Sequence, residues 1–378
     1  MAGRQSPLEH MEKLMFAGVY PQRRVLVTGH TGFKGSWLCC WLLSLGAKVA
    51  GFSLGIPTQP ANFQILDLEN RLEHFQGDIR HREVLQQAMT EFAPEMVFHL
   101  AAQALVRRSY AAPAETFETN TLGTMNVLEC LRHQPSVRAA VIITSDKCYR
   151  NVEWTWGYRE NDTLGGEDPY SASKAGAELV SYAYLKSYFE TGRLQLATAR
   201  AGNVIGGGDW APDRLVPDCV RAWAAGQPVK IRSPQATRPW QHVLEPLSGY
   251  LWLGARLWQE ESLVHGESFN FGPAPAVNQS VGELLAAISR YWPQTAWEPE
   301  VAESQARESQ LLKLCCDKAM NFLNWHAVLS FEETIRLTAE WYQAYYEQGP
   351  EPMYGLTCGQ IADYQSRAQA QGLAWAGS

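Results

Sequence analysis

The sequence lacks the clusters of cysteine and of basic residues that mark zinc sites and nucleic-acid surfaces. Its eight cysteines include two directly adjacent couples but no CxxC pair, which favours reduced thiols over disulfides or zinc. The formal net charge is −7, and lysine and arginine form no run. Because neutralising phosphates requires clustered positive charge, we predict no nucleic-acid partner, and we predict no metal site.

Long apolar runs are also missing. No stretch of about 18 uncharged apolar residues, the length of a membrane span, occurs in the chain. The first 20 residues carry charges on both sides of a short apolar piece and do not contain the apolar core of a signal peptide. We therefore predict a cytoplasmic protein that does not enter a membrane.

A strand, a glycine-rich turn and a helix follow one another in the stretch RVLVTGHTGFKGSWLCCWLLSLG, residues 24–46. An unbroken apolar run precedes the three glycines Gly29, Gly32 and Gly35, and apolar residues of helical character follow them. This order is the dinucleotide-binding fingerprint, in which the helix N-terminus receives a pyrophosphate. The alternative is a glycine turn of an ordinary α/β unit.

The next segments leave two features of a dinucleotide site open. A second strand is predicted over 47–53, but Ser53 and Leu54 stand where an acid usually binds the adenosine ribose, so NAD and NADP are not distinguished. Asp78, after a third strand, is either the acceptor for the adenine amino group or a solvated loop aspartate.

Small residues follow the fourth predicted strand, residues 96–100, in the sequence HLAAQ, and they allow backbone to lie close to a cofactor. We expect His99 to be packed rather than to bind metal, because no second ligand stands at a suitable spacing. A helix is predicted over 113–133, and Asn120 in its middle is placed to bond backbone across the sheet.

The fifth predicted strand ends in Thr144, Ser145, Asp146 and Lys147. Ligands of doubly wound sheets bind beyond the carboxyl ends of the strands, so this cluster points to the cofactor crevice. A helix cap is the alternative reason for a serine and an aspartate at a strand end.

Tyr170 and Lys174 stand four residues apart at the start of a helix predicted to run to about Phe189, so they share one helix face. A phenol acts as a base near neutrality only if its pKa falls well below about 10. A neighbouring ammonium group and an oxidised nicotinamide both favour the phenolate.

Seven motifs carry a resemblance to a known family: GHTGFKGSWL, HLAAQ, TSDKCY, WGYREND, YSASK, RAGNVIGGGDWA and RPWQHVLEPLSGY. With them the chain resembles the extended short-chain dehydrogenases/reductases of the nucleotide-sugar branch, and within that branch the CDP-glucose 4,6-dehydratases. The motifs cover residues 24–250 densely. The resemblance implies an α/β fold: a Rossmann-type doubly wound parallel sheet with a smaller mixed α/β substrate-binding lobe towards the C-terminus.

The resemblance also implies a domain plan. Residues 1–20 are expected to form an N-terminal extension, and residues 21–202 an NAD-binding Rossmann domain to which 241–269 return. Residues 203–240 and 270–378 are then expected to form the nucleotide-sugar lobe.

The reaction implied by the resemblance is the NAD-dependent dehydration of CDP-glucose. Hydride leaves C4 of the sugar, water is lost across C5 and C6, and hydride returns to C6. The implied catalytic residues are Ser145, Asp146, Lys147, Tyr170 and Lys174. The implied cofactor residues are Gly29, Thr31, Gly32, Phe33, Lys34, Gly35, Asp78, Ile79, Leu100, Ala101, Ala102, Gln103, Asn120, Tyr170 and Lys174. The implied substrate residues are Asn203, Arg214 and Arg238.

Tyr170 is the expected base at the 4-hydroxyl, with Ser145 bonded to the same oxygen, and Asp146 is the expected acid for the leaving 6-hydroxyl. The role of Lys147 stays open, because related dehydratases commonly carry a glutamate there as the C5 base and an ammonium group has no lone pair. Lys147 must either be neutral or orient the enolate while another group removes the proton.

Other assignments rest on the resemblance or remain open. A homodimer or a dimer of dimers is expected, with a role in deoxysugar biosynthesis such as that of lipopolysaccharide O-antigen. Trp210 either stacks on a base or packs in the core, and Arg232 is expected to be solvated. The alternative functions are a nucleotide-sugar 4-epimerase, which has no water to expel, and a catalytically idle protein that senses dinucleotide.

Overall fold

The computed structural model describes residues 14–231, 233–274, 277–292, 296–299 and 311–377. In this part of the chain, seven parallel strands form one sheet in the order β11-β6-β5-β4-β1-β2-β3. The strands are β1 (Arg24–Thr28), β2 (Lys48–Ser53), β3 (Glu73–Gln76), β4 (Met96–His99), β5 (Ala139–Ile143), β6 (Gln195–Arg200) and β11 (Ser268–Asn270). The doubly wound Rossmann-type sheet predicted from the sequence is confirmed.

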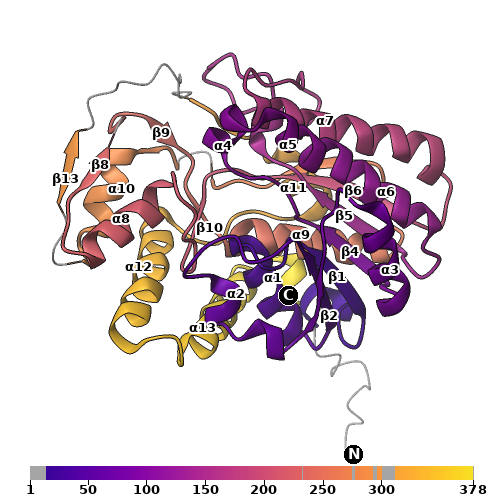
Figure 1. Ribbon diagram of the computed structural model, residues 1–378, viewed down its shortest axis with the longest axis horizontal. Helices are drawn as coiled ribbons and strands as arrows, with labels where there is room; N and C mark the ends of the chain where they lie inside the picture. The colour runs from indigo at the N-terminus through magenta and orange to yellow at the C-terminus, as the bar shows by residue number, and fades with distance from the viewer. Residues whose placement is uncertain (1–13, 232, 275–276, 293–295, 300–310, 378) are drawn as a thin grey trace, which may run out of the picture.

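Helices cover both faces of the sheet, which explains why its central strands β1, β4 and β5 read as largely apolar runs. Val25 and Val27 of β1 pack into one core, and Leu26 between them packs into the other. The first core takes in α1 (Phe33–Ser44), α9 (Leu244–Trp258) and α13 (Met353–Ala370). The second takes in α3 (Arg82–Phe92) and α6 (Gly123–His133), with α7 (Pro169–Tyr184) beside α6 (Figure 1).

A second group of elements lies beside the sheet, on the left in Figure 1. Its helices are α8 (Leu215–Ala224), α10 (Val281–Ile288) and α12 (Phe331–Gln348). Its paired short strands are β7 (Val204–Ile205) with β10 (Gln241–His242), β8 (Val229–Ile231) with β13 (Trp297–Pro299), and β9 (Thr237–Arg238) with β12 (Gln279–Ser280). The remaining α-helices are α2 (Asn62–Ile65), α4 (Val106–Ala111), α5 (Pro113–Phe117) and α11 (Asp317–Leu323).

The helix predicted over 113–133 is interrupted. A π-helical turn, Glu118–Leu122, stands between α5 and α6, and a second one, Leu185–Phe189, follows α7. Such turns insert an extra residue into the helix and are frequent at functional sites. The first turn contains Asn120, the polar residue that the sequence singled out.

Three residues of the segment expected to form an extension, Phe16, Val19 and Tyr20, are buried in the core. Phe16 stacks on Trp375 with ring centroids 5.1 Å apart, and the Tyr20 hydroxyl donates to the Leu251 carbonyl at 2.5 Å. All eight cysteines are free. Among the described residues no helix is long and apolar enough to span a membrane, and no group of metal-ligating side chains comes together.

Candidate active site

The glycine loop between β1 and α1 has the shape that a dinucleotide requires. Gly29 has φ +76°, and a Cβ there would lie 2.7 Å from the Ala101 nitrogen. A Cβ on Gly35 would lie 2.2 Å from the Gly29 oxygen, whereas one on Gly32 would meet only that oxygen, at 3.3 Å. Gly29 and Gly35 are therefore required for the tight turn and for the packing of α1 on the loop. Gly32 leaves space for a ligand to approach the N-terminus of α1. No side chain caps the first turn of α1, so its N–H groups are available to pyrophosphate oxygens.

The other residues of the loop hold it in place or reach past it. The Thr31 hydroxyl donates to the Gly55 carbonyl at 2.7 Å, and the Thr31 N–H donates to the Ser53 hydroxyl. These two hydrogen bonds tie the loop to the end of β2. Phe33 and Lys34 line the cleft beyond the loop. Ser53, which stands in place of the usual acid, also bonds the buried His30 at 2.9 Å.

Asp78 and Ile79 follow β3, the strand at one edge of the sheet. Asp78 accepts from the Arg80 side chain at 2.6 Å. Although burial raises the pKa of Asp78, its bonds to Arg80 outweigh that effect and hold the pKa below its usual value. Ile79 is buried, and its side chain fills the space that a Cβ on Gly123 would need.

The segment after β4 is held by Asn120. The Asn120 side chain accepts from the Gln103 N–H at 2.8 Å and donates to the Gln103 carbonyl at 2.9 Å, so it bonds backbone as the sequence predicted. The Ala101 N–H donates to the Thr28 hydroxyl. Leu100 and Ala102, on either side of Ala101 in the sequence, are half-buried. His99 is buried between Thr28 and Thr124, as expected for a packed histidine.

Ser145 begins a short 3₁₀ turn, Asp146–Cys148, directly after β5. Its hydroxyl accepts from the Lys147 N–H at 3.2 Å and donates to the Asp146 carboxylate at 3.0 Å. Asp146 is only 3% exposed, Lys147 is half-buried, and all three line one cleft. Ser145 therefore caps the turn, as the alternative predicted, and it also lines the cleft.

Tyr170 and Lys174 lie on the first turns of α7, which Asp168 caps by accepting from the Ser171 N–H at 2.9 Å. Burial raises the pKa of Tyr170 to about 12, and a bond with Ser145 acts in the opposite direction. Burial lowers the pKa of Lys174 to about 8, while Cys148 and Glu178 raise it. The protein alone does not give the phenol the lowered pKa that a base needs.

The cleft that contains these groups has a volume of about 460 Å³ and runs from Tyr170 towards the second group of elements. Asn203 lines it with a left-handed backbone, φ +53°, which asparagine tolerates well. Arg214 pairs with Asp209 at 2.8 Å, and both Arg214 and Arg238 line the cleft. The structure thus brings all three predicted substrate residues to the same cleft.

Two other sequence expectations have different outcomes. Trp210 is buried, and its ring packs edge-on against Trp341, Tyr342 and Tyr345, so it belongs to the core and does not face a ligand. Arg232 lies outside the described residues.

The sequence reasoning missed Gly202 and Arg107. A Cβ on Gly202 would lie 1.9 Å from an Asp146 carboxylate oxygen, so the glycine makes room for this side chain. Gly202 stands in the quoted motif RAGNVIGGGDWA, but nothing local links it to Asp146. Arg107, from the segment after β4, lines the cleft and pairs with Asp213 across 106 residues of sequence at 2.7 Å.

Comparisons with known proteins agree with this geometry. The sequence profile described as GDP-mannose 4,6 dehydratase matches residues 26–338. The chain is 46% identical over 349 residues to a CDP-glucose 4,6-dehydratase of Salmonella typhimurium, covering 91% of this chain and 96% of that protein.

Solved structures resemble the whole fold. A UDP-glucose 4-epimerase of Thermus thermophilus in complex with NAD is 28% identical, with a TM-score of 0.73 over 85% of this chain and 99% of that one. A dTDP-glucose 4,6-dehydratase of Streptomyces venezuelae with NAD bound is 25% identical, with a TM-score of 0.72 over 87% and 99%.

Proposed function

Because the chain belongs to the GDP-mannose 4,6-dehydratase family of extended short-chain dehydrogenases/reductases, we propose that it is an NAD-dependent hydro-lyase that converts CDP-glucose to CDP-4-keto-6-deoxyglucose. The observation that carries this proposal is the 46% identity over 91% of the chain to a CDP-glucose 4,6-dehydratase. The loop from Gly29 to Gly35 would hold NAD, which would supply the acceptor for the C4 hydride and the donor for its return to C6.

The first step is the removal of the 4-hydroxyl proton by Tyr170. Ser145 lies close enough to bond this phenol and the same sugar oxygen. Because burial alone raises the pKa of Tyr170, the phenolate needs the positive charge of the oxidised nicotinamide and the field of the α7 N-terminus. Lys174, on the same face of the helix, holds the phenol and the nicotinamide ribose.

The second step is the loss of water across C5 and C6. The 4-ketone acidifies the C5 proton, and the 6-hydroxyl leaves as water after it receives a proton. Asp146 is the donor in this proposal, because its carboxyl group is buried, lines the cleft and lies within hydrogen-bond distance of Ser145 at 3.0 Å. The resulting enone accepts hydride at C6 and a proton at C5.

Lys147 is the remaining candidate for chemistry at C5. Its half-buried side chain lines the cleft beside Asp146. Lys147 acts either as a neutral amine that takes the C5 proton or as a cation that stabilises the enolate. A 4-epimerase loses no water, so its reaction needs no group for chemistry at C5.

Substrate binding is assigned to three residues from the second group of elements. Arg214 and Arg238 supply planar positive charge for the diphosphate, and Asn203 bonds the sugar or its phosphate. The backbone between these residues lines the same cleft. These two arginines supply positive charge for the diphosphate locally, so an overall negative net charge is compatible with an anionic substrate.

Association of two chains is proposed through an apolar face on the outside of the NAD-binding part. Four exposed side chains form it: Phe117, Leu122, Leu179 and Tyr182. Since α5 packs against α7, these side chains lie on neighbouring helices. We infer a homodimer or a dimer of dimers in the cytoplasm that supplies deoxysugar biosynthesis, as for lipopolysaccharide O-antigen.

The function is tested by incubating the protein with CDP-glucose and a catalytic amount of NAD. The expected product shows the alkaline absorbance of a 4-keto-6-deoxy sugar, and NADH does not accumulate. A 4-epimerized sugar without that absorbance would instead favour the epimerase. Stoichiometric NADH would indicate an ordinary dehydrogenase, and no reaction with any nucleotide sugar would indicate a dinucleotide sensor.

A further inference from the structure

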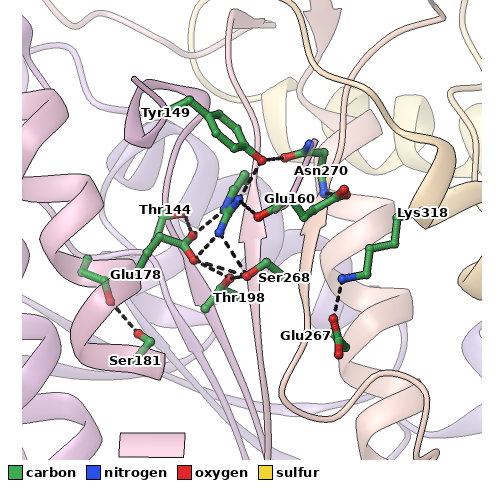
Figure 2. A network of polar contacts seen from close by, with 12 residues as sticks. Thr144, Tyr149, Glu160, Glu178, Ser181, Thr198, Glu267, Ser268, Asn270 and Lys318 are labelled. Carbon is green, nitrogen blue, oxygen red and sulfur yellow. Dashed lines mark hydrogen bonds and ion pairs between the residues drawn. The ribbon is translucent and has the colours of Figure 1, made fainter. Parts of the chain in front are cut away.

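A buried ion pair lies directly behind the catalytic residues. Glu178 stands one helical turn after Lys174 and two turns after Tyr170 on α7, so all three occupy one face of the helix. Its carboxylate meets Arg200 at the end of β6, with nitrogen–oxygen distances of 2.9 and 2.8 Å (Figure 2). The two side chains are only 4% and 3% exposed.

The Glu178 carboxylate also receives hydrogen bonds from two threonines, one directly after β5 and one inside β6. The Thr144 hydroxyl donates to the oxygen that faces β5, and the Thr198 hydroxyl donates to the other oxygen at 2.9 Å. Thr144 is the residue directly before Ser145, whereas Thr198 lies inside β6 and adjoins no residue of the cleft. One carboxylate thus joins the helix of Tyr170 to the strand that ends in Ser145.

Arg200 extends the same network to the loop after β5 and to the end of β11. Its guanidinium donates to the Tyr149 hydroxyl at 2.7 Å and to the Glu160 carbonyl at 2.9 Å. Tyr149 in turn donates to Asn270 at the end of β11 at 2.8 Å (Figure 2). Both carboxylate oxygens of Glu178 and all three guanidinium nitrogens of Arg200 therefore form hydrogen bonds.

A buried ion pair is costly to desolvate, and apolar residues of the same volume are often equally stable. Stability alone is therefore a weak reason for this arrangement. We propose that Glu178 is a positioning residue, which holds Thr144 and through it Ser145 at a fixed distance from Tyr170 and Lys174. This role rests on the proposed function, since it concerns the C4 oxidation that these groups carry out.

A pair of threonine variants separates positioning from stability. Thr144→Val and Thr198→Val each remove one buried hydroxyl bonded to Glu178, with little change in volume, and each is expected to lower the melting temperature to a similar extent. Only Thr144→Val loosens the residue next to Ser145. We expect its kcat for CDP-glucose to fall by about 10–100-fold with KM within about twofold, because small displacements of reacting groups are costly. The kcat of Thr198→Val should stay within about twofold of the parent.

An isotope effect gives a readout that a merely structural role would not change. With CDP-glucose deuterated at C4, slowing of the oxidation step should raise the primary isotope effect on kcat in Thr144→Val and leave it unchanged in Thr198→Val. Equal kcat values or equal isotope effects for the two variants, beside an active parent, would overturn the positioning role. A parent that does not turn over CDP-glucose would contradict the proposed function itself.

Discussion

Gly202→Ala is the substitution whose effect can be worked out most fully from the structure. A Cβ at this position would lie 1.9 Å from one Asp146 carboxylate oxygen, 2.1 Å from its carbon and 2.4 Å from the other oxygen. These are the three nearest neighbours, so the clash falls on Asp146. An ordinary contact begins at 3.4 Å, so the carboxylate must move by about 3.4 − 1.9 = 1.5 Å.

A displacement of this size is expected to impair water loss more than C4 oxidation. A misplacement of about 1 Å costs a catalytic group roughly 100-fold in rate, which corresponds to about 2.7 kcal/mol. Tyr170 and Lys174 lie on α7, and none of the three atoms nearest to the new methyl group belongs to them, so the oxidation step should continue. The bound ketone should then accumulate together with NADH.

Stopped-flow absorbance in a single turnover measures this directly. The variant should show a larger and longer-lived NADH signal than the parent. Gly272→Ala is the matched control, because Gly272 stands two residues after β11 as Gly202 stands two residues after the paired strand β6. The nearest neighbour of its Cβ would be the Cys316 sulfur at 3.3 Å, and we expect parental kinetics. Parental dehydration by Gly202→Ala would refute the placement of Asp146 as the elimination acid.

Three further substitutions test separate parts of the account. Tyr170→Phe removes the base and should slow C4 oxidation at least about 100-fold in pre-steady-state NADH formation, whereas near-normal turnover would reassign the base. Asp146→Asn cannot deliver a proton, so kcat should fall by about 10²–10⁴ while NADH still forms; loss of oxidation as severe as in Tyr170→Phe would require a different donor. Burial raises the pKa of Glu245 to about 7, against about 4.3 in an unfolded chain, so the unfolded state loses this proton first. The free energy of unfolding should therefore fall as pH rises from about 4.3 to about 7, by up to roughly 3 kcal/mol, and denaturant titrations should show no such fall in Glu245→Gln. Identical pH dependence of the parent and Glu245→Gln would contradict the raised pKa.

The parts of the fold that sequence patterns predicted well are those with a strong local signal. The strand predicted over 47–53 is β2, Lys48–Ser53, and the run before Gly29 is β1, buried on both faces. The short strand pairs of the second group of elements were not predicted, because strands of two or three residues carry no periodicity and their register depends on distant partners. The π turn at Asn120 was missed for a related reason: one inserted residue leaves the apolar pattern almost unchanged.

The candidate site shows the same division. Tyr170 and Lys174 were recognisable from their helical spacing, and the turn after β5 from its position at a strand end. The contact of Gly202 with Asp146 joins residues that are far apart in the sequence, and the expected lowering of the Tyr170 pKa is opposed by burial that only the folded chain reveals. Both depend on tertiary packing, which a single sequence does not encode locally.

The transfer of hydride within one sugar is the central claim, and an isotopic label follows it most directly. CDP-glucose deuterated at C4 is converted with catalytic NAD, and the product is examined by NMR. The account predicts that the deuterium lies at C6 of the 4-keto-6-deoxy sugar and that NADH does not accumulate. Deuterium that remains at C4 of an epimerized sugar, or that leaves the sugar in accumulating reduced cofactor, would contradict it.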